Sequence, residues 1–294
     1  MKNIDQNKLI SVEEFCNEMG RLIYYFDQTI DTIRFDSKAL VVYLTLIKKI
    51  ISNADAANKL IIEGHIKEAK IILRSAVESV ILITYLSQFP EKIEDYLDEA
   101  QILKIKNNFI IYKSMRDGEP IDVNGTTISK EELSAENEKY FNSIQEQAKQ
   151  KILKGIGVKE YKISDSNFPK FDKYFTNFRP QFMKYEKMIK ELDDTGFKLE
   201  DEFVFGLRDI VYGFYNDSSQ IAHSCFLDWS EPTYFTQKEA EYMFHFFMKV
   251  TLFLKVLLKG SVNFENDHTP QFVREMRKTN DKLEMIIYGK LLKH

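Results

Sequence analysis

Residues 66–88 read IKEAKIILRSAVESVILITYLSQ and decide the fold, because an apolar run of helical length, 71–86, lies inside them. Arg74 and Glu78 interrupt that run, so it lacks the roughly 20 uninterrupted apolar residues of a membrane-spanning helix. The residue ahead of Pro90 is pushed out of the α region, so the helix must end before Phe89. We therefore predict a buried helix over residues 66–88.

Capping and breaking residues on the amino-terminal side of this stretch define its neighbours. Ser37 is placed to cap a helix whose apolar residues recur at three- and four-residue spacing as far as Leu60, and Gly64 follows as its stop. Only about two residues then separate this helix from the next, which makes the two antiparallel neighbours. Ser11 with Glu14 forms a capping-box pattern that opens a first helix over residues 12–35.

The remaining patterns are mostly helical and complete one domain. In chain order they are a polar helix at 91–116, a short hairpin at Asn124-Gly125, a polar peripheral helix at 129–154, an aromatic-rich connector at 155–180, and helices at 181–194, 199–225, 236–259 and 270–293. The sequence thus predicts an all-α protein. Residues 1–294 form a single bundle of about nine helices, with a peripheral polar and aromatic insertion at 117–178.

Composition supports this fold class and narrows the function. Only 11 Gly and 6 Pro punctuate 294 residues, and 44% of the residues are hydrophobic, which favours long helices in a globular protein. The formal net charge of −4 is too small to steer a partner from a distance. The chain has no Gly-rich phosphate loop, Gly-x-Ser-x-Gly elbow or paired-Cys motif. This argues against a nucleotide-binding α/β fold and against an α/β-hydrolase.

Cysteine and histidine spacing argues against a metal or cofactor site. Cys16 and Cys225 have no partner at metal or redox spacing, and we expect both to be reduced and buried. A di-iron bundle would place a Glu three residues before a His, and neither His223 nor His245 has one. The first eight residues lack the apolar stretch of a secretory signal, so the expected location is the cytoplasm, with no membrane partner.

Three hydrogen-bonding side chains align on one later helix. Tyr215, Ser219 and His223 are spaced by four, which places them within about 80° on one helix face. The same row runs back through the apolar residues 211 and 207, so the stripe should point inward. Buried polar groups need partners, and Arg74 and Glu78, one turn apart on the 66–88 helix, are the candidates.

Two interpretations of these five residues remain open. In the first, they form a satisfied buried network that fixes helix register. In the second, His223 is a general acid or base, because the unperturbed pKa of histidine, about 6.5, suits proton transfer at neutral pH. Glu78 or Tyr215 would then set its tautomer. Arg74 would hold an anion such as a transferring phosphate, since its planar fork binds two oxygens.

The residues 73–78, LRSAVE, together with the Tyr215, Ser219 and His223 row, resemble a bacterial family of helical proteins with no assigned function. That family is similar in turn to the HEPN superfamily (higher eukaryotes and prokaryotes nucleotide-binding), whose members are helical bundles and often dimers. Many members are metal-independent ribonucleases in toxin–antitoxin, phage-defence or CRISPR systems. Their signature is an Arg, a polar residue and, a few positions on, a His on one helix.

Asn216 and His223 match the polar residue and the histidine of that signature, whereas Tyr215 stands at the arginine position. The resemblance therefore implies a ribonuclease only if Arg74 supplies the cation from the neighbouring helix. On this basis we expect an intracellular, HEPN-like protein that acts on RNA or a nucleotide, with a homodimer as the implied assembly. The alternative is a non-catalytic binding or scaffold protein whose polar network is structural.

A local excess of positive charge is a second candidate feature. Residues 149–190 hold 11 Lys and Arg against 4 Asp and Glu. This stretch is able to follow a nucleic-acid backbone while the aromatic residues Tyr161, Phe168, Tyr174 or Phe178 stack on bases. The favoured interpretation is that the aromatics are core residues and the lysines solvate the outside. Residues 244–258 leave almost no polar face, so that helix is central or forms an oligomer interface.

Overall fold

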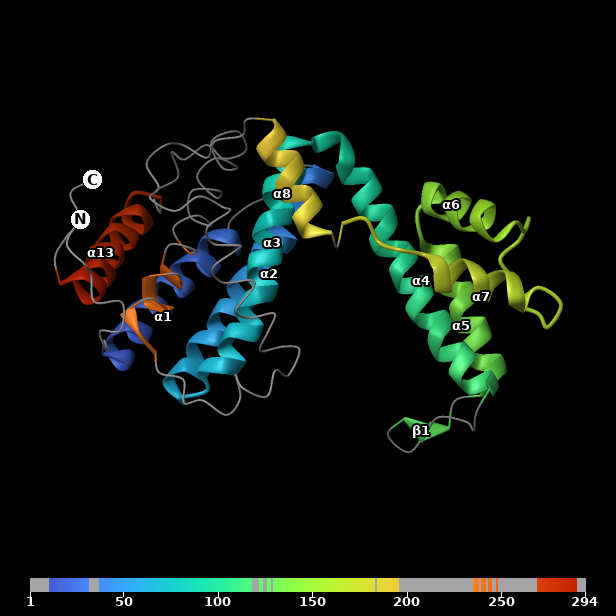
Figure 1. The fold of residues 1–294 in the computed structure, drawn as a ribbon, viewed down its shortest axis with the longest axis horizontal. Helices are drawn as coiled ribbons and strands as arrows, with labels where there is room; N and C mark the ends of the chain where they lie inside the picture. Colours follow the sequence, from blue (N-terminus) through green and yellow to red (C-terminus); the bar gives the residue numbers. More distant parts are fainter. Residues whose placement is uncertain are drawn as a thin grey trace. The chain divides into compact units, whose positions relative to one another are not determined.

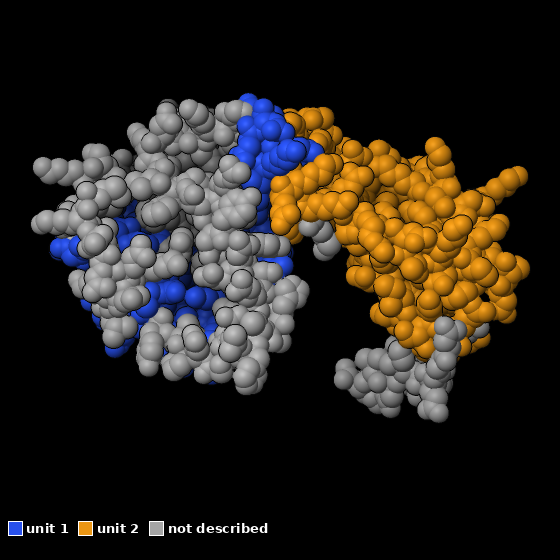
Figure 2. All heavy atoms as spheres, viewed as in Figure 1, with its two compact units in different colours: residues 1–88, 188–294 blue, residues 89–187 orange. Residues whose placement is uncertain are grey.

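The computed structural model describes residues 11–31, 37–117, 122–123, 126–127, 129–182, 184–195, 235–237, 239–241, 243–244, 247 and 269–289. The all-α fold class is confirmed, since helices dominate these residues (Figure 1). Contacts divide the chain into two compact units, residues 1–88 with 188–294 and residues 89–187 (Figure 2). The insertion expected at 117–178 lies within the second unit, which also takes in the helix before it.

The first unit is built on an antiparallel pair of long helices, α2 (Lys38–Ile62) and α3 (Ile66–Gln88). Ser37 begins α2, because its hydroxyl accepts a hydrogen bond from the Leu40 amide at 3.2 Å. Gly64 adopts φ of +84°, a left-handed conformation that glycine reaches without steric cost. The chain therefore reverses in the short turn between the end of α2 and the start of α3. These signals are local in sequence, and the predicted hairpin of helices is confirmed.

Helices α1 (Val12–Asp31) and α13 (Thr269–Tyr288) also contribute to the core of the first unit (Figure 1). α1 packs on both α2 and α13, and its fully buried residues include Phe15, Met19 and Phe26. The Asn58 side chain of α2 donates to the Cys16 carbonyl at 2.9 Å, which links α2 to α1 in the interior. Cys16 is buried as expected, with 1% of its surface exposed.

Short polar contacts fix the far end of the α2–α3 pair. The Tyr43 hydroxyl donates to the Leu86 carbonyl at 3.0 Å, so the start of α2 is held against the end of α3. The Tyr85 hydroxyl of α3 bonds to Glu191 of α8 (Tyr185–Asp194). Both bonds join residues of the first unit, so the end of α3 is anchored by a phenol of α2 and by its own Tyr85 phenol as well as by apolar packing.

The helices of the second unit include η1 (Pro90–Lys92), α4 (Ile93–Asp117), α5 (Lys130–Ser143), α6 (Glu146–Ile156) and α7 (Phe168–Asn177). Its core is a cluster of aromatic rings. Phe109 of α4 lies 5.0 Å from Phe175 of α7, and Phe141 stacks on Tyr161 at 4.1 Å. Aromatic pairs at such distances add to the stability that burial alone supplies.

Two predictions for this unit are wrong in detail. The single helix expected at 129–154 is two helices, because Ile144 is extended (ψ 166°) and turns its side chain into the core. The adjacent Gln145 amide donates to Gln101 Oε1 of α4 at 2.7 Å, which holds the break in place. The connector expected at 155–180 contains the helix α7. Pro169 stands in its first turn, where a proline is tolerated.

Other predicted local signals are confirmed. Ser129 and Glu132 form a reciprocal capping box at the start of α5. The hairpin expected around Asn124-Gly125 is flanked by two short antiparallel strands, β1 (Asp122–Val123) and β2 (Thr126–Thr127). Among the described helices, we find none whose length and hydrophobicity would let it span a membrane.

Candidate functional site

The Arg74–Glu78 pair predicted from the sequence is formed in the structure. Arg74 Nε lies 3.2 Å from Glu78 Oε1, one turn along α3. The neighbouring positions Leu73, Ala76 and Val77 are buried, whereas Arg74 and Glu78 expose 22% and 20% of their side chains. The pair therefore lies at the edge of the apolar interior, where an ion pair is screened by water less than on an open surface.

A second ion pair, which the sequence analysis missed, continues the same row. Lys70 precedes Arg74 by one turn, and its ammonium lies 3.2 Å from Glu239 Oε1. Each step of four residues advances the helix by 400°, so Lys70, Arg74 and Glu78 fall within about 80° on one face of α3. The four-residue spacing was the available signal for Lys70, whereas Glu239 lies 169 positions away and gave none.

Glu239 also caps the segment that carries it. Its carboxylate accepts hydrogen bonds from the Thr236 hydroxyl and from the Thr236 amide, the latter at 3.1 Å. Burial opposes ionisation of Glu239, but the Thr236 bonds and the nearby Lys70 ammonium outweigh it and lower the pKa of this carboxyl. Glu239 is therefore held as an anion. It links the start of its own helical segment to Lys70, Arg74 and Glu78, which we name the charged row of α3.

The expected partners of Arg74 on the later helix cannot be placed. Tyr215, Asn216, Ser219 and His223 lie outside the described residues. The structure therefore shows the Arg74–Glu78 ion pair, and the meeting of this pair with the His223 imidazole stays a prediction.

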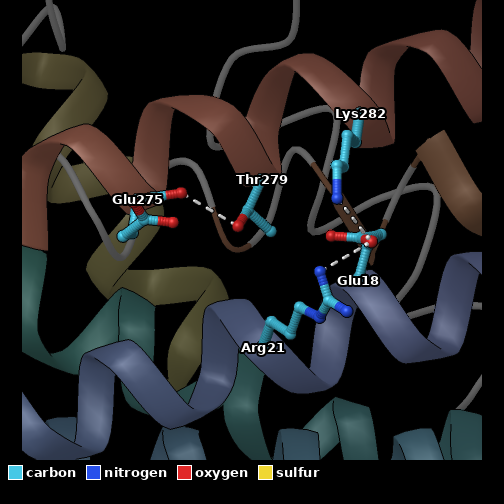
Figure 3. A network of polar contacts seen from close by, with 5 residues as sticks. All are labelled: Glu18, Arg21, Glu275, Thr279 and Lys282. Carbon is cyan, nitrogen blue, oxygen red and sulfur yellow. Dashed lines mark hydrogen bonds and ion pairs between the residues drawn. The ribbon is translucent and has the colours of Figure 1, made fainter.

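A separate polar network joins α1 to α13. Glu18 Oε1 forms ion pairs with Arg21 at 3.3 Å and with Lys282 at 3.2 Å, while the Thr279 hydroxyl donates to the Glu275 carbonyl (Figure 3). A cleft of about 720 Å³ adjoins this network. Its lining is Ser11, Glu14, Glu18, Asp281, Lys282, Met285, Ile286 and Gly289. The cleft is lined by residues other than Arg74 and Glu78, so it is a feature distinct from the charged row.

The aromatic residues of the 149–190 stretch are mainly structural. Tyr161 and Phe168 expose 5% and 8% of their surface, and both belong to the core of the second unit. Tyr174 and Phe178 are half-buried and pack against the same core. The interpretation of these aromatics as core residues is confirmed, and base stacking by Tyr161 or Phe168 is wrong because their rings are covered.

The cations of α4 and α6 hold the second unit together. Arg116 lies 3.8 Å from the centre of the Phe168 ring, and Lys113 is paired with Asp172 at 2.8 Å. Lys151 lies 2.8 Å from carboxylate oxygens of both Asp95 and Asp98. Burial lowers the pKa of Lys151, but these two carboxylates outweigh it and raise the pKa above its ordinary value.

Within the residues that the structure covers, no three His, Cys, Asp or Glu side chains converge as a metal site would require. Comparison with curated proteins finds no match, and comparison with solved structures finds none either. Residues 40–242 match a family whose description is "Family of unknown function (DUF5677)". The match covers more than half of the chain, including the charged row of α3 and the predicted 215–223 stripe. The chain therefore belongs to the DUF5677 family, a family of unknown function.

Proposed function

We propose that this protein acts on RNA or on a nucleotide, and that Arg74 and His223 are its central residues. The observation that carries the proposal is the charged row of α3. The Arg74 guanidinium is paired with the Glu78 carboxylate, 3.2 Å away, at the edge of the apolar interior of the first unit. Retaining such a pair among buried residues is costly unless its hydrogen bonds are satisfied, so its presence calls for a role.

The chemistry follows from the residue types. With RNA as substrate, His223 accepts the proton of a 2′-hydroxyl, and the 2′-oxygen attacks the adjacent phosphorus. The bond from phosphorus to the 5′-oxygen breaks, and the leaving oxygen takes up the proton that His223 accepted. The products are a 2′,3′-cyclic phosphate and a 5′-hydroxyl. Arg74 stabilises the added negative charge on the phosphate oxygens, and Glu78 positions Arg74. Tyr215, Asn216 and Ser219 orient the histidine and the substrate.

The proposal is tested by RNA degradation and by toxicity on expression in cells. The wild type is compared with Arg74→Ala and His223→Ala, in buffer with and without EDTA. We expect each substitution to lower cleavage by at least a hundredfold and EDTA to have no effect. Arg21→Ala is the matched control, because Arg21 also pairs with a carboxylate on its own helix but lies on α1.

Melting temperatures separate a chemical effect from unfolding. Arg74→Lys keeps the positive charge and most of the packing but removes the guanidinium, which can bind two phosphate oxygens at once. This variant should therefore fold normally and lose activity. Equal cleavage by the wild type, Arg74→Lys and His223→Ala would refute the proposal.

A second candidate function is a non-catalytic helical scaffold. It is favoured by one observation: Arg74 forms an ion pair with Glu78 of its own helix, an arrangement that also stabilises a bundle without a substrate. This candidate predicts that Arg74→Ala lowers the melting temperature while the wild type cleaves no RNA.

A further inference from the structure

The turn before α7 and the outer side of α7 carry three lysines that form no ion pair with any described residue. Core residues Phe168, Phe171 and Phe175 define the inner side of α7, and Lys170 and Lys173 lie opposite them, about 60° apart on the helix. Lys162 precedes this helix. Its carbonyl accepts a hydrogen bond from the Asn167 side chain at 2.7 Å, so the turn is fixed against the start of α7.

Two of the three carboxylates of this segment, Asp165 and Asp172, are paired with cations of α4. Residues 154–179 contain six Lys and Arg but three Asp and Glu. Asp172 is paired with Lys113 of α4 at 2.8 Å, and Asp165 is paired with Arg116 of α4 at 3.5 Å. Among the described residues, Lys162, Lys170 and Lys173 take part in no ion pair, and all three are exposed. We name these three lysines the α7 basic face.

The segment that carries the α7 basic face has no strongly exposed large hydrophobic residue of its own. The large hydrophobic residues that are strongly exposed in the described parts of the chain are Tyr24, Val41, Ile62, Ile110, Ile111 and Met285, and none belongs to residues 154–179. Protein partners are usually held by buried aromatic or aliphatic anchors, whereas a phosphate backbone needs only positive charge. We infer that the α7 basic face binds the phosphate backbone of a nucleic acid, without reading its bases.

This inference does not depend on catalysis at Arg74. It predicts binding that is insensitive to base sequence, because the rings of Phe168, Phe171 and Phe175 are occupied in the core and are not available for stacking. It also predicts strong salt dependence, since each phosphate contact releases condensed counterions. Double-stranded nucleic acid should bind more tightly than single-stranded, because its phosphates are more densely spaced along the axis.

The test uses the full-length protein and fluorescence anisotropy with a 20-base-pair DNA duplex, which lacks the 2′-hydroxyl and so cannot undergo the proposed cleavage. Lys162→Gln/Lys170→Gln/Lys173→Gln removes the α7 basic face. The matched control is Lys38→Gln/Lys48→Gln/Lys49→Gln, which removes three exposed lysines of α2. Melting temperatures confirm that both variants fold.

We expect the wild type to bind two duplexes of unrelated sequence equally. Loss of three phosphate contacts should reduce the slope of log K against log salt by up to about 2.7, and affinity at 0.1 M NaCl by at least about tenfold. The α2 control should stay within twofold of the wild type. The inference would be overturned if both triple variants lost the same affinity for the duplex, or if the wild type did not bind the duplex at 50 mM NaCl. Binding of polyglutamate as tight as that of the duplex would instead assign this face to an acidic protein.

Discussion

Replacing Gly155 with alanine should destabilise the second unit when the Tyr174 ring is present and stabilise it when that ring is removed. Gly155 lies in the last turn of α6, where a Cβ would be 2.1 Å from Tyr174 Cε2, far inside van der Waals contact. The ring must therefore move away. Tyr174 packs on Phe175 at 5.1 Å and on Phe178 at 6.1 Å, so its displacement disturbs the aromatic cluster.

Two free-energy terms compete in this substitution. Alanine is a better helix former than glycine, which favours the variant by about 0.5–1 kcal/mol. Overpacking of a well-filled site costs about 1–3 kcal/mol. We expect Gly155→Ala to destabilise the second unit by about 0–2.5 kcal/mol when Tyr174 is present. In the Tyr174→Ala background the ring is gone, and the same substitution should stabilise the unit by about 0.5–1 kcal/mol.

Hydrogen–deuterium exchange of peptides from α6 and α7 measures the local free energy of opening in all four proteins of this cycle. Gly20→Ala is the matched control, because Gly20 lies inside α1 and its added Cβ would meet Asn58 Nδ2 at an ordinary 3.5 Å. Gly20→Ala should therefore be stabilising on its own. The reasoning is refuted if Gly155→Ala has the same effect with and without the Tyr174 ring.

Three further predictions concern buried groups. Phe171→Ala should destabilise the second unit by about 3–5 kcal/mol, measured by the same exchange method, because Phe171 is fully buried between Phe109 and Tyr161; a loss below 1 kcal/mol would contradict this packing. Glu239→Gln should destabilise the first unit by about 1–3 kcal/mol at pH 7. Because the pKa of Glu239 is lowered, this difference from the wild type should shrink as the pH falls below 4.5, and a difference unchanged at pH 3 would be inconsistent with the Lys70 pair. In a Cys225→Ser background, Cys16 should react with a thiol reagent at pH 8 at least about a thousandfold more slowly than after denaturation. Burial raises the pKa of Cys16 to about 12, and rapid labelling of the folded protein would contradict its buried position.

Local sequence signals predicted the elements whose boundaries are set locally. Ser37, Gly64 and the Phe89-Pro90 pair marked the ends of α2 and α3 because each acts through its own backbone. The break between α5 and α6 was missed, since it depends on Ile144 reaching the core and on Gln101 of a distant helix accepting a bond.

Helix α7 was missed for a different reason. Its signal was present, because Phe168, Phe171 and Phe175 recur at helical spacing, but Pro169 was taken as a breaker instead of a first-turn residue. In the candidate site, too, contacts within one helix could be predicted and contacts between distant segments could not. Arg74 and Glu78 pair within one helix and could be predicted, whereas Lys70 with Glu239 required knowledge of which distant segments meet.

The central claim is that the Arg74 guanidinium and the His223 imidazole share one small site. The most direct measurement is the pKa of the His223 imidazole, followed by heteronuclear NMR and assigned with a His223→Gln variant. Arg74→Ala should raise that pKa by removing a nearby positive charge, and Glu78→Gln should lower it by removing a negative one. A His223 pKa that stays the same in both variants, with the fold intact, would place the two groups apart and contradict the account.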